Sequence, residues 1–94
     1  MVYLSQQGCS HCYSFKEKFS KVLENNNLFS YEMDISNLNS DELDELVAIF
    51  KTAGFNLSGT PTLIIARNGI VDIKEGDISE DEILTFLGEY EFID

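Results

Sequence analysis

The chain has no tryptophan, one proline, one histidine and two cysteines among its 94 residues. Two cysteines are too few for the multi-bridge framework that stabilises small secreted domains. No apolar run approaches the roughly 20 residues that a membrane-spanning helix needs, and no secretory leader precedes Val2. These absences predict one soluble globular domain, residues 1–94, without a membrane segment.

Basic residues are also scarce. Six Lys and Arg residues stand against 17 Asp and Glu residues, which gives a formal net charge of -11. Phosphate contacts need clustered basic side chains, so we expect no nucleic-acid partner. The negative charge favours solubility, and electrostatic choice of partner is the alternative interpretation. We expect the chain to be a monomer.

The rest of the sequence alternates between strand and helix patterns. Strands are predicted at Val2–Leu4, Leu28–Ile35, Thr62–Ala66 and about Ile70–Lys74, with Asn68-Gly69 as the tight turn of a hairpin between the last two. Buried helix positions are predicted at Phe15, Phe19, Val22 and Leu23; at Leu43, Leu46, Val47 and Phe50; and at Ile83, Leu84, Phe86 and Leu87.

Helix ends are predicted from their capping residues. The first helix stops at Asn25-Asn26-Asn27, the second is capped by Asn39 with Glu42 and ends at Gly54, and the third follows the pair Ser79 and Glu82. The order is βαβαββα. Strands joined through helices are expected to be parallel and the hairpin to add an antiparallel edge, so we predict an α/β fold with a four-stranded mixed sheet and helices on both faces.

Both cysteines and the histidine lie in one short segment, GCSHCYSF, Gly8 to Phe15. Cys9 follows the first strand and stands at the N-terminus of the first helix, where free N–H groups and the helix dipole stabilise a thiolate. Cys12 lies one turn further in and is better shielded. We therefore predict Cys9 as the nucleophile of thiol–disulfide exchange and Cys12 as the thiol that releases the mixed disulfide.

His11 is the third candidate catalytic residue. As an imidazolium it would lower the pKa of Cys9 below the ordinary value of about 8.5, stabilise the reduced form and make the pair a stronger oxidant. The alternative is a solvated loop histidine with little influence.

Two other uses of these residues compete with exchange chemistry. A zinc site would draw on Cys9, Cys12 and His11, but tetrahedral zinc needs a fourth ligand and the chain holds no other Cys or His, so we predict no metal. Inert buried thiols are the second alternative. A C-x-x-C at a strand-to-helix junction favours redox chemistry over both.

Further motifs extend this pattern along the chain. They are FNLSGTPTLII from Phe55 to Ile65, RNGIV from Arg67 to Val71, and GDIS from Gly76 followed by a helix. With Cys9-Ser10-His11-Cys12 they resemble the thioredoxin-like superfamily, from Val2 to about Phe92.

The resemblance implies a thioredoxin-like fold with a cis Thr60–Pro61 bond opposite the cysteines. It also implies that the Thr60 backbone pairs with an extended substrate. The residues assigned to substrate binding are Thr60, Pro61, Gly59, Gly8 and Ser10. Phe55 and Leu57 are expected to be core residues rather than substrate contacts.

The chain departs from the thioredoxin pattern at several positions. Tyr3 stands six residues before Cys9, where many thioredoxins carry a buried aspartate assigned to proton transfer with the resolving thiol. Gly8 replaces the tryptophan usual before the first cysteine, and the N-terminal strand and helix of full-size thioredoxins are absent. The histidine placement resembles that of periplasmic dithiol oxidases. In size and sequence style the chain resembles some Gram-positive thioredoxin-like proteins, including the bacteriocin transport accessory group.

We predict a dithiol–disulfide oxidoreductase that acts on protein or small-molecule disulfides or dithiols without a bound cofactor, together with an unidentified redox partner. The direction of catalysis stays open. The alternative is a non-enzymatic binding or accessory module with regulatory thiols. An exchange pair works in a reducing or an oxidising compartment. The missing leader slightly favours the cytoplasm, and a cell-surface location applies if a leader was removed.

Overall fold

The computed structural model describes residues 1–93, so Asp94, the last residue of the predicted domain, lies outside the described residues. The strands and helices follow the predicted order, with one additional 3-10 turn, η1. The elements are β1 (Val2–Ser5), α1 (Ser10–Asn25), β2 (Tyr31–Asp34), η1 (Ile35–Asn37), α2 (Ser40–Thr52), β3 (Thr62–Ala66), β4 (Ile70–Glu75) and α3 (Glu80–Glu89).

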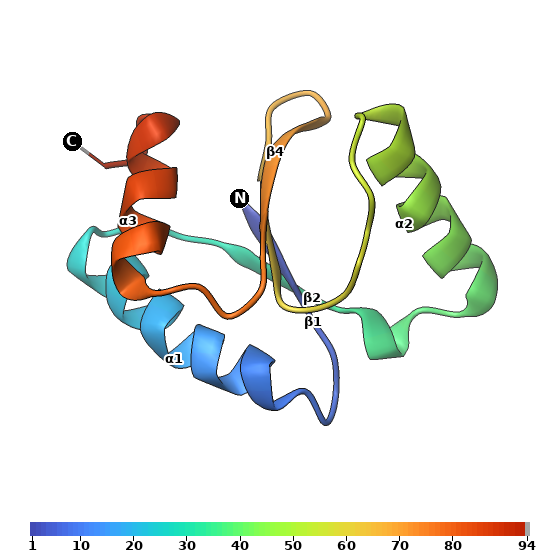
Figure 1. The fold of residues 1–94 in the computed structure, drawn as a ribbon, viewed down its shortest axis with the longest axis horizontal. Helices are drawn as coiled ribbons and strands as arrows, with labels where there is room; N and C mark the ends of the chain where they lie inside the picture. The colour runs from blue at the N-terminus through green and yellow to red at the C-terminus, as the bar shows by residue number, and fades with distance from the viewer. Residues whose placement is uncertain (94) are drawn as a thin grey trace.

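The four strands form one mixed sheet in the order β2-β1-β3-β4. β1 is parallel to β2, whereas β3 is antiparallel to both β1 and β4. The expectation that β3 would be parallel was therefore wrong. Residues 53–61, after α2, run back along the sheet before β3 begins, so β3 starts at the edge where β1 ends, as the yellow segment of Figure 1 shows. This extra pass brings Pro61 to the cysteine end of β1.

Helices cover both faces of the sheet, as predicted, with α1 and α3 on one face and α2 on the other (Figure 1). Side chains of β1 alternate between the two faces. Tyr3 belongs to the aromatic cluster under α1 and α3, with Phe15 and Phe19 at ring-centroid distances of 5.8 and 5.5 Å. Leu4 belongs to the smaller cluster under α2, with Phe50 and Ile64. β1 is thus held by both cores.

The two predicted capping boxes are present, at Asn39 with Glu42 and at Ser79 with Glu82. The buried stripe of α2 is shorter than predicted. Phe50 is fully buried, but Leu43 is 37% exposed, because α2 packs on the sheet through its second half.

The second strand is also shorter than the predicted Leu28–Ile35. The Leu28 N–H bonds to the Leu23 carbonyl and completes the end of α1, while Asp34 caps η1 through the Ser36 N–H. The apolar alternation of this segment leaves three large side chains exposed: Phe29, which precedes the strand, and Tyr31 and Met33 on the edge strand β2.

Candidate active site

The turn between β1 and α1 presents the cysteines. Gly8 has a φ of +74°, a conformation that side-chain-bearing L residues rarely adopt, which gives a backbone reason for the absence of tryptophan here. Cys9 is the N-cap of α1, and its Sγ accepts the Cys12 N–H at 3.1 Å. Cys9 and Cys12 form a disulfide. The predicted cysteine position at the helix N-terminus is confirmed.

The two sulfurs differ in accessibility. Cys12 is 3% exposed and belongs to the buried set, whereas Cys9 is partly exposed. An attacking thiol must reach a substrate sulfur, and a resolving thiol needs to reach only its neighbour. The assignment of Cys9 as nucleophile and Cys12 as resolving thiol stays a prediction that fits this difference.

The segment before β3 lies against Cys9. The Thr60–Pro61 peptide bond is cis, as the resemblance implied. Cys9 Sγ lies 3.8 Å from the Thr60 carbonyl oxygen and 3.6 Å from Thr60 Oγ1. This segment is held on either side, since Thr62 Oγ1 donates to the Gly59 carbonyl at 2.7 Å and the Gly76 N–H donates to the Pro61 carbonyl at 2.9 Å.

A shallow depression of about 400 Å³ adjoins this segment, and its lining residues are His11, Thr60, Pro61, Gly76 and Asp77. The fold thus brings predicted residues from two distant segments to one surface. Ser10 begins α1 and is exposed, and Gly8 lies in the preceding turn. The effect of His11 on the pKa of Cys9 stays a prediction. Phe55 and Leu57 pack against the core cluster under α2, as expected.

Asp77 is the acidic residue among those that line this depression. Lys18 Nζ lies 2.7 Å from Asp77 Oδ1, and this hydrogen-bonded ion pair holds the pKa of the Asp77 carboxyl below its usual range. Its charge is therefore compensated by Lys18 beside the depression.

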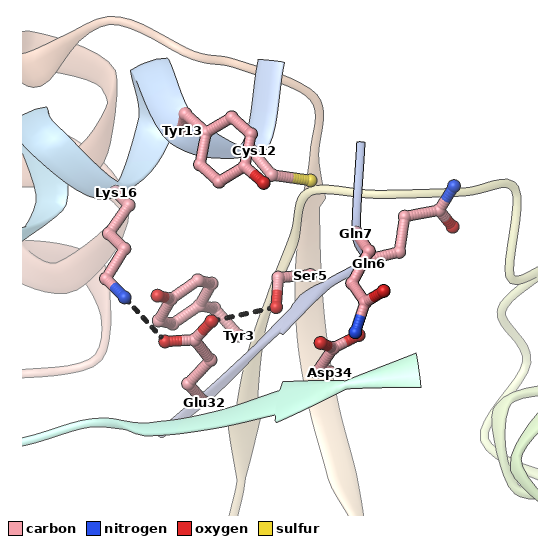
Figure 2. Close-up of a pocket in the computed structure, with 9 residues that line it drawn as sticks. All are labelled: Tyr3, Ser5, Gln6, Gln7, Cys12, Tyr13, Lys16, Glu32 and Asp34. Carbon is pink, nitrogen blue, oxygen red and sulfur yellow. Dashed lines mark hydrogen bonds and ion pairs between the residues drawn. The ribbon is translucent and has the colours of Figure 1, made fainter. Parts of the chain in front are cut away.

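A second, smaller cavity of about 90 Å³ lies behind Cys12. Figure 2 shows its lining residues: Tyr3, Ser5, Gln6, Gln7, Cys12, Tyr13, Lys16, Glu32 and Asp34. Glu32 is its most connected acidic group. Ser5 Oγ donates to Glu32 Oε2 at 2.9 Å and Lys16 Nζ lies 3.1 Å from Glu32 Oε1, the two dashed lines of Figure 2.

The polar groups of this cavity influence one another. The Tyr3 hydroxyl is buried beside Glu32 without a well-formed hydrogen bond, and its burial, together with the adjacent carboxylate, raises the pKa of Tyr3. The Tyr3 hydroxyl, Lys16 and Ser5 hold the pKa of Glu32 below its usual range. Glu32 is therefore ionised at neutral pH.

Sequence reasoning missed Glu32 as a site residue. The signal was the alternation of two strands, because Tyr3 and Ser5 share one face of β1, and Glu32 and Asp34 share one face of β2. Parallel pairing in the register Tyr3↔Glu32 and Ser5↔Asp34 brings the four side chains together. The sequence shows the polar alternation of each strand, but it does not show the register of β1 against β2, and it is this register that brings the polar side chains together.

Among residues 1–93, no group of three or more His, Cys, Asp and Glu side chains is arranged to hold a metal ion. Within the same range, no helix is both long and apolar enough to cross a bilayer.

No protein-family model matches the chain, and no curated protein matches it. Solved structures do. Thioredoxin f2 of Chlamydomonas reinhardtii superposes with a TM-score of 0.73 at 16% identity, over 99% of this chain and 79% of that chain. Deadhead, the germline-specific thioredoxin of Drosophila melanogaster, gives 0.66 at 13% identity, over 94% of this chain and 76% of that chain. At these identities the likeness shows the fold, and the predicted thioredoxin-like fold is confirmed.

Proposed function

We propose that this thioredoxin-fold chain is a thiol–disulfide oxidoreductase that exchanges disulfides with protein or small-molecule substrates. The observation that carries the proposal is the Cys9–Cys12 disulfide at the N-terminus of α1, with Cys12 buried, Cys9 partly exposed and the Thr60 carbonyl 3.8 Å from Cys9 Sγ.

In the reducing direction, the Cys9 thiolate attacks one sulfur of a substrate disulfide. The new Cys9–substrate bond forms as the substrate disulfide breaks, and the departing substrate thiolate takes a proton from solvent. Cys12 then loses its proton and attacks Cys9 Sγ, which releases the second substrate thiolate and forms the Cys9–Cys12 disulfide. Two electrons pass from the dithiol to the substrate, and the reverse sequence oxidises a substrate dithiol.

The N-terminus of α1 favours the thiolate form of Cys9. The Cys12 N–H already points at Cys9 Sγ at 3.1 Å, and a hydrogen bond to a charged acceptor is stronger than one to a neutral acceptor. The positive end of the helix dipole acts in the same direction. Both effects stabilise the thiolate relative to the thiol.

Substrate recognition rests on backbone and uncharged surface. No Asp, Glu, Lys or Arg occurs from Met1 to Phe15, in a chain with a net charge of -11. An extended peptide pairing with the backbone beside Pro61 would place its sulfur next to Cys9 without meeting an uncompensated charge.

The test compares reduced wild-type protein with Cys9→Ser and Cys12→Ser on a neutral peptide disulfide, by mass spectrometry of quenched samples. We expect turnover in the wild type, a stable mixed disulfide in Cys12→Ser, and neither in Cys9→Ser. Wild-type protein that reacts no faster than a free small-molecule thiol would refute the enzymatic proposal and favour a passive binding module. Adducts that accumulate in Cys9→Ser instead would reverse the two roles.

A further inference from the structure

We infer that Glu32 is the proton acceptor for the Cys12 thiol, acting through water in the cavity behind the disulfide. This inference rests on the proposed exchange function and identifies how the buried thiol becomes a thiolate. It starts from the placement of Cys12, which is 3% exposed. Burial disfavours a thiolate, so each resolution step needs a route by which the Cys12 proton leaves.

The cavity provides such a route. Its volume of about 90 Å³ exceeds the roughly 10–15 Å³ that one water requires, and a cavity holds water when it offers polar partners. Those partners are the hydroxyls of Tyr3 and Ser5 and the carboxylate of Glu32. The Tyr3 residue is 5% exposed and its hydroxyl has no hydrogen-bond partner among residues 1–93, so it is available to a water molecule.

Glu32 is suited to accept a proton and pass it on. Glu32 is ionised at neutral pH, and its side chain is 38% exposed, so a proton that it acquires can leave to solvent. Figure 2 shows the carboxylate beside Tyr3 and Ser5 on the sheet, below the turn of α1 that carries Cys12. Glu32 therefore lines the cavity and is also in contact with bulk water.

Asp34 is the other carboxylate of the cavity, but it already has a structural role. Its Oδ1 accepts the Ser36 N–H at 2.9 Å as the cap of η1. The titratable groups around Glu32 are Tyr3 from β1, Cys12, Tyr13 and Lys16 from α1, and Asp34 on its own strand. Among them, Glu32 is the carboxylate bonded to a buried hydroxyl, that of Ser5.

The proposed step balances as follows. In the mixed disulfide, the Cys12 S–H proton passes to a cavity water, which gives a proton to Glu32. The Cys12 thiolate attacks Cys9 Sγ, and the Cys9–substrate bond breaks with its electron pair leaving on the substrate sulfur. That thiolate takes a proton from solvent, and Glu32 returns its proton to solvent. In the oxidising direction Glu32 reprotonates Cys12.

The experiment uses rapid mixing of the reduced protein with dithiobis(nitrobenzoate), whose two thiolates are coloured when released. The first release reports the attack of Cys9, and the second reports resolution by Cys12. In Glu32→Gln we expect the second phase to slow by at least about tenfold, since a positioned proton acceptor contributes about 10²–10⁴-fold and cavity water replaces part of it. The first phase should change by less than about twofold, because Glu32 lies behind Cys12, away from the attacking sulfur.

The pH profile separates proton transfer from a structural effect. The second phase of Glu32→Gln should rise about tenfold per pH unit between about pH 6 and about pH 8, because hydroxide must then take the proton, while the wild type varies less steeply. Added imidazole should accelerate the variant and not the wild type. Glu32→Asp, which keeps the carboxylate, should give an intermediate rate with the wild-type profile.

Two control variants match the change in charge. Glu17→Gln removes a carboxylate from the exposed surface of α1 and should leave both phases unchanged. Asp34→Asn removes the rival acceptor and should leave the second phase within about twofold. A Glu32→Gln protein that resolves at the wild-type rate, or faster because a repelling charge has gone, overturns the inference, as does a slow second phase in Asp34→Asn alone. Failure of the first phase in the wild type would instead refute the proposed function.

Discussion

A negative charge placed beside Cys9 should stabilise the fold and weaken the nucleophile at the same time. α2 and α3 carry acidic residues in their first turns, which favours those helices through the dipole, but α1 has none. The relevant change is Ser10→Glu, at the first residue of α1. We expect it to raise the free energy of unfolding by about 0.3–1 kcal/mol, the usual gain from an acid at this position.

The same charge acts on the thiolate with the opposite sign. At about 7 Å, two unit charges interact by about 0.6 kcal/mol in bulk water and about 2.4 kcal/mol at an effective dielectric constant near 20. Repulsion between these limits raises the pKa of Cys9 by about one unit. Below the titration midpoint the thiolate fraction then falls about tenfold, but its nucleophilicity rises by about threefold, so attack slows by about threefold.

Two measurements on Ser10→Glu test this reasoning, with Ser10→Gln as the uncharged control of the same size. Thermal and denaturant unfolding of the oxidised form gives stability, and thiolate absorbance against pH gives the titration of Cys9 in the reduced form. A protein that gains stability while the pKa of Cys9 stays constant or falls would refute the assignment of Cys9 to the dipole of α1. An equal effect of Ser10→Gln would show that charge is not the cause.

Three further predictions concern His11, the packing of α2 and the ionisation of Glu32. His11→Ala should raise the pKa of Cys9 and make the pair more reducing; an unchanged titration and reduction potential would leave His11 as a solvated loop residue. Phe50→Ala should cost about 3–5 kcal/mol in denaturant unfolding and Leu43→Ala less than about 1 kcal/mol, because only the first is buried; equal costs would contradict the packing of α2. The folded-state pKa of Glu32 is depressed, so the stability that Glu32 contributes is present above its ordinary pKa and is lost as the pH falls through the folded-state pKa. The free energy of unfolding of Glu32→Gln should therefore vary less with pH in the acidic range than that of the wild type. An equal pH dependence of the two proteins would contradict the depressed pKa.

Local sequence signals predicted those parts of the fold that are local in cause. The capping pairs Asn39–Glu42 and Ser79–Glu82 fix helix starts through bonds three residues apart, and both are present. The predicted direction of β3 was wrong, because the direction depends on the path of residues 53–61, which no short sequence pattern encodes. The prediction that Leu43 is buried was wrong for a related reason. The helical period shows which face of α2 is apolar, but not how far along the helix the sheet extends.

The same division applies to the site. Cys9 and Cys12 were identified from their spacing, because a helix N-terminus is a local feature. Thr60 needed the family resemblance to be placed beside Cys9. Glu32 needed the register of β1 against β2, and one step of slippage would have put its side chain on the opposite face from Tyr3.

The distribution of acidic residues links the fold to the chemistry. With 17 Asp and Glu residues and a net charge of -11, the chain would raise the energy of any exposed thiolate if those charges were spread evenly. Instead, charged residues are absent from Met1 to Phe15, and Cys9 itself caps α1 with its sulfur. Two carboxylates that line the hollows around the sulfurs are paired with lysines: Asp77 with Lys18, and Glu32 with Lys16. The two sulfurs therefore experience different surroundings. Cys9 has a helix end and uncharged surface, which favour a thiolate, and Cys12 has a cavity with a proton acceptor, which lets its thiolate form when the mixed disulfide must be resolved.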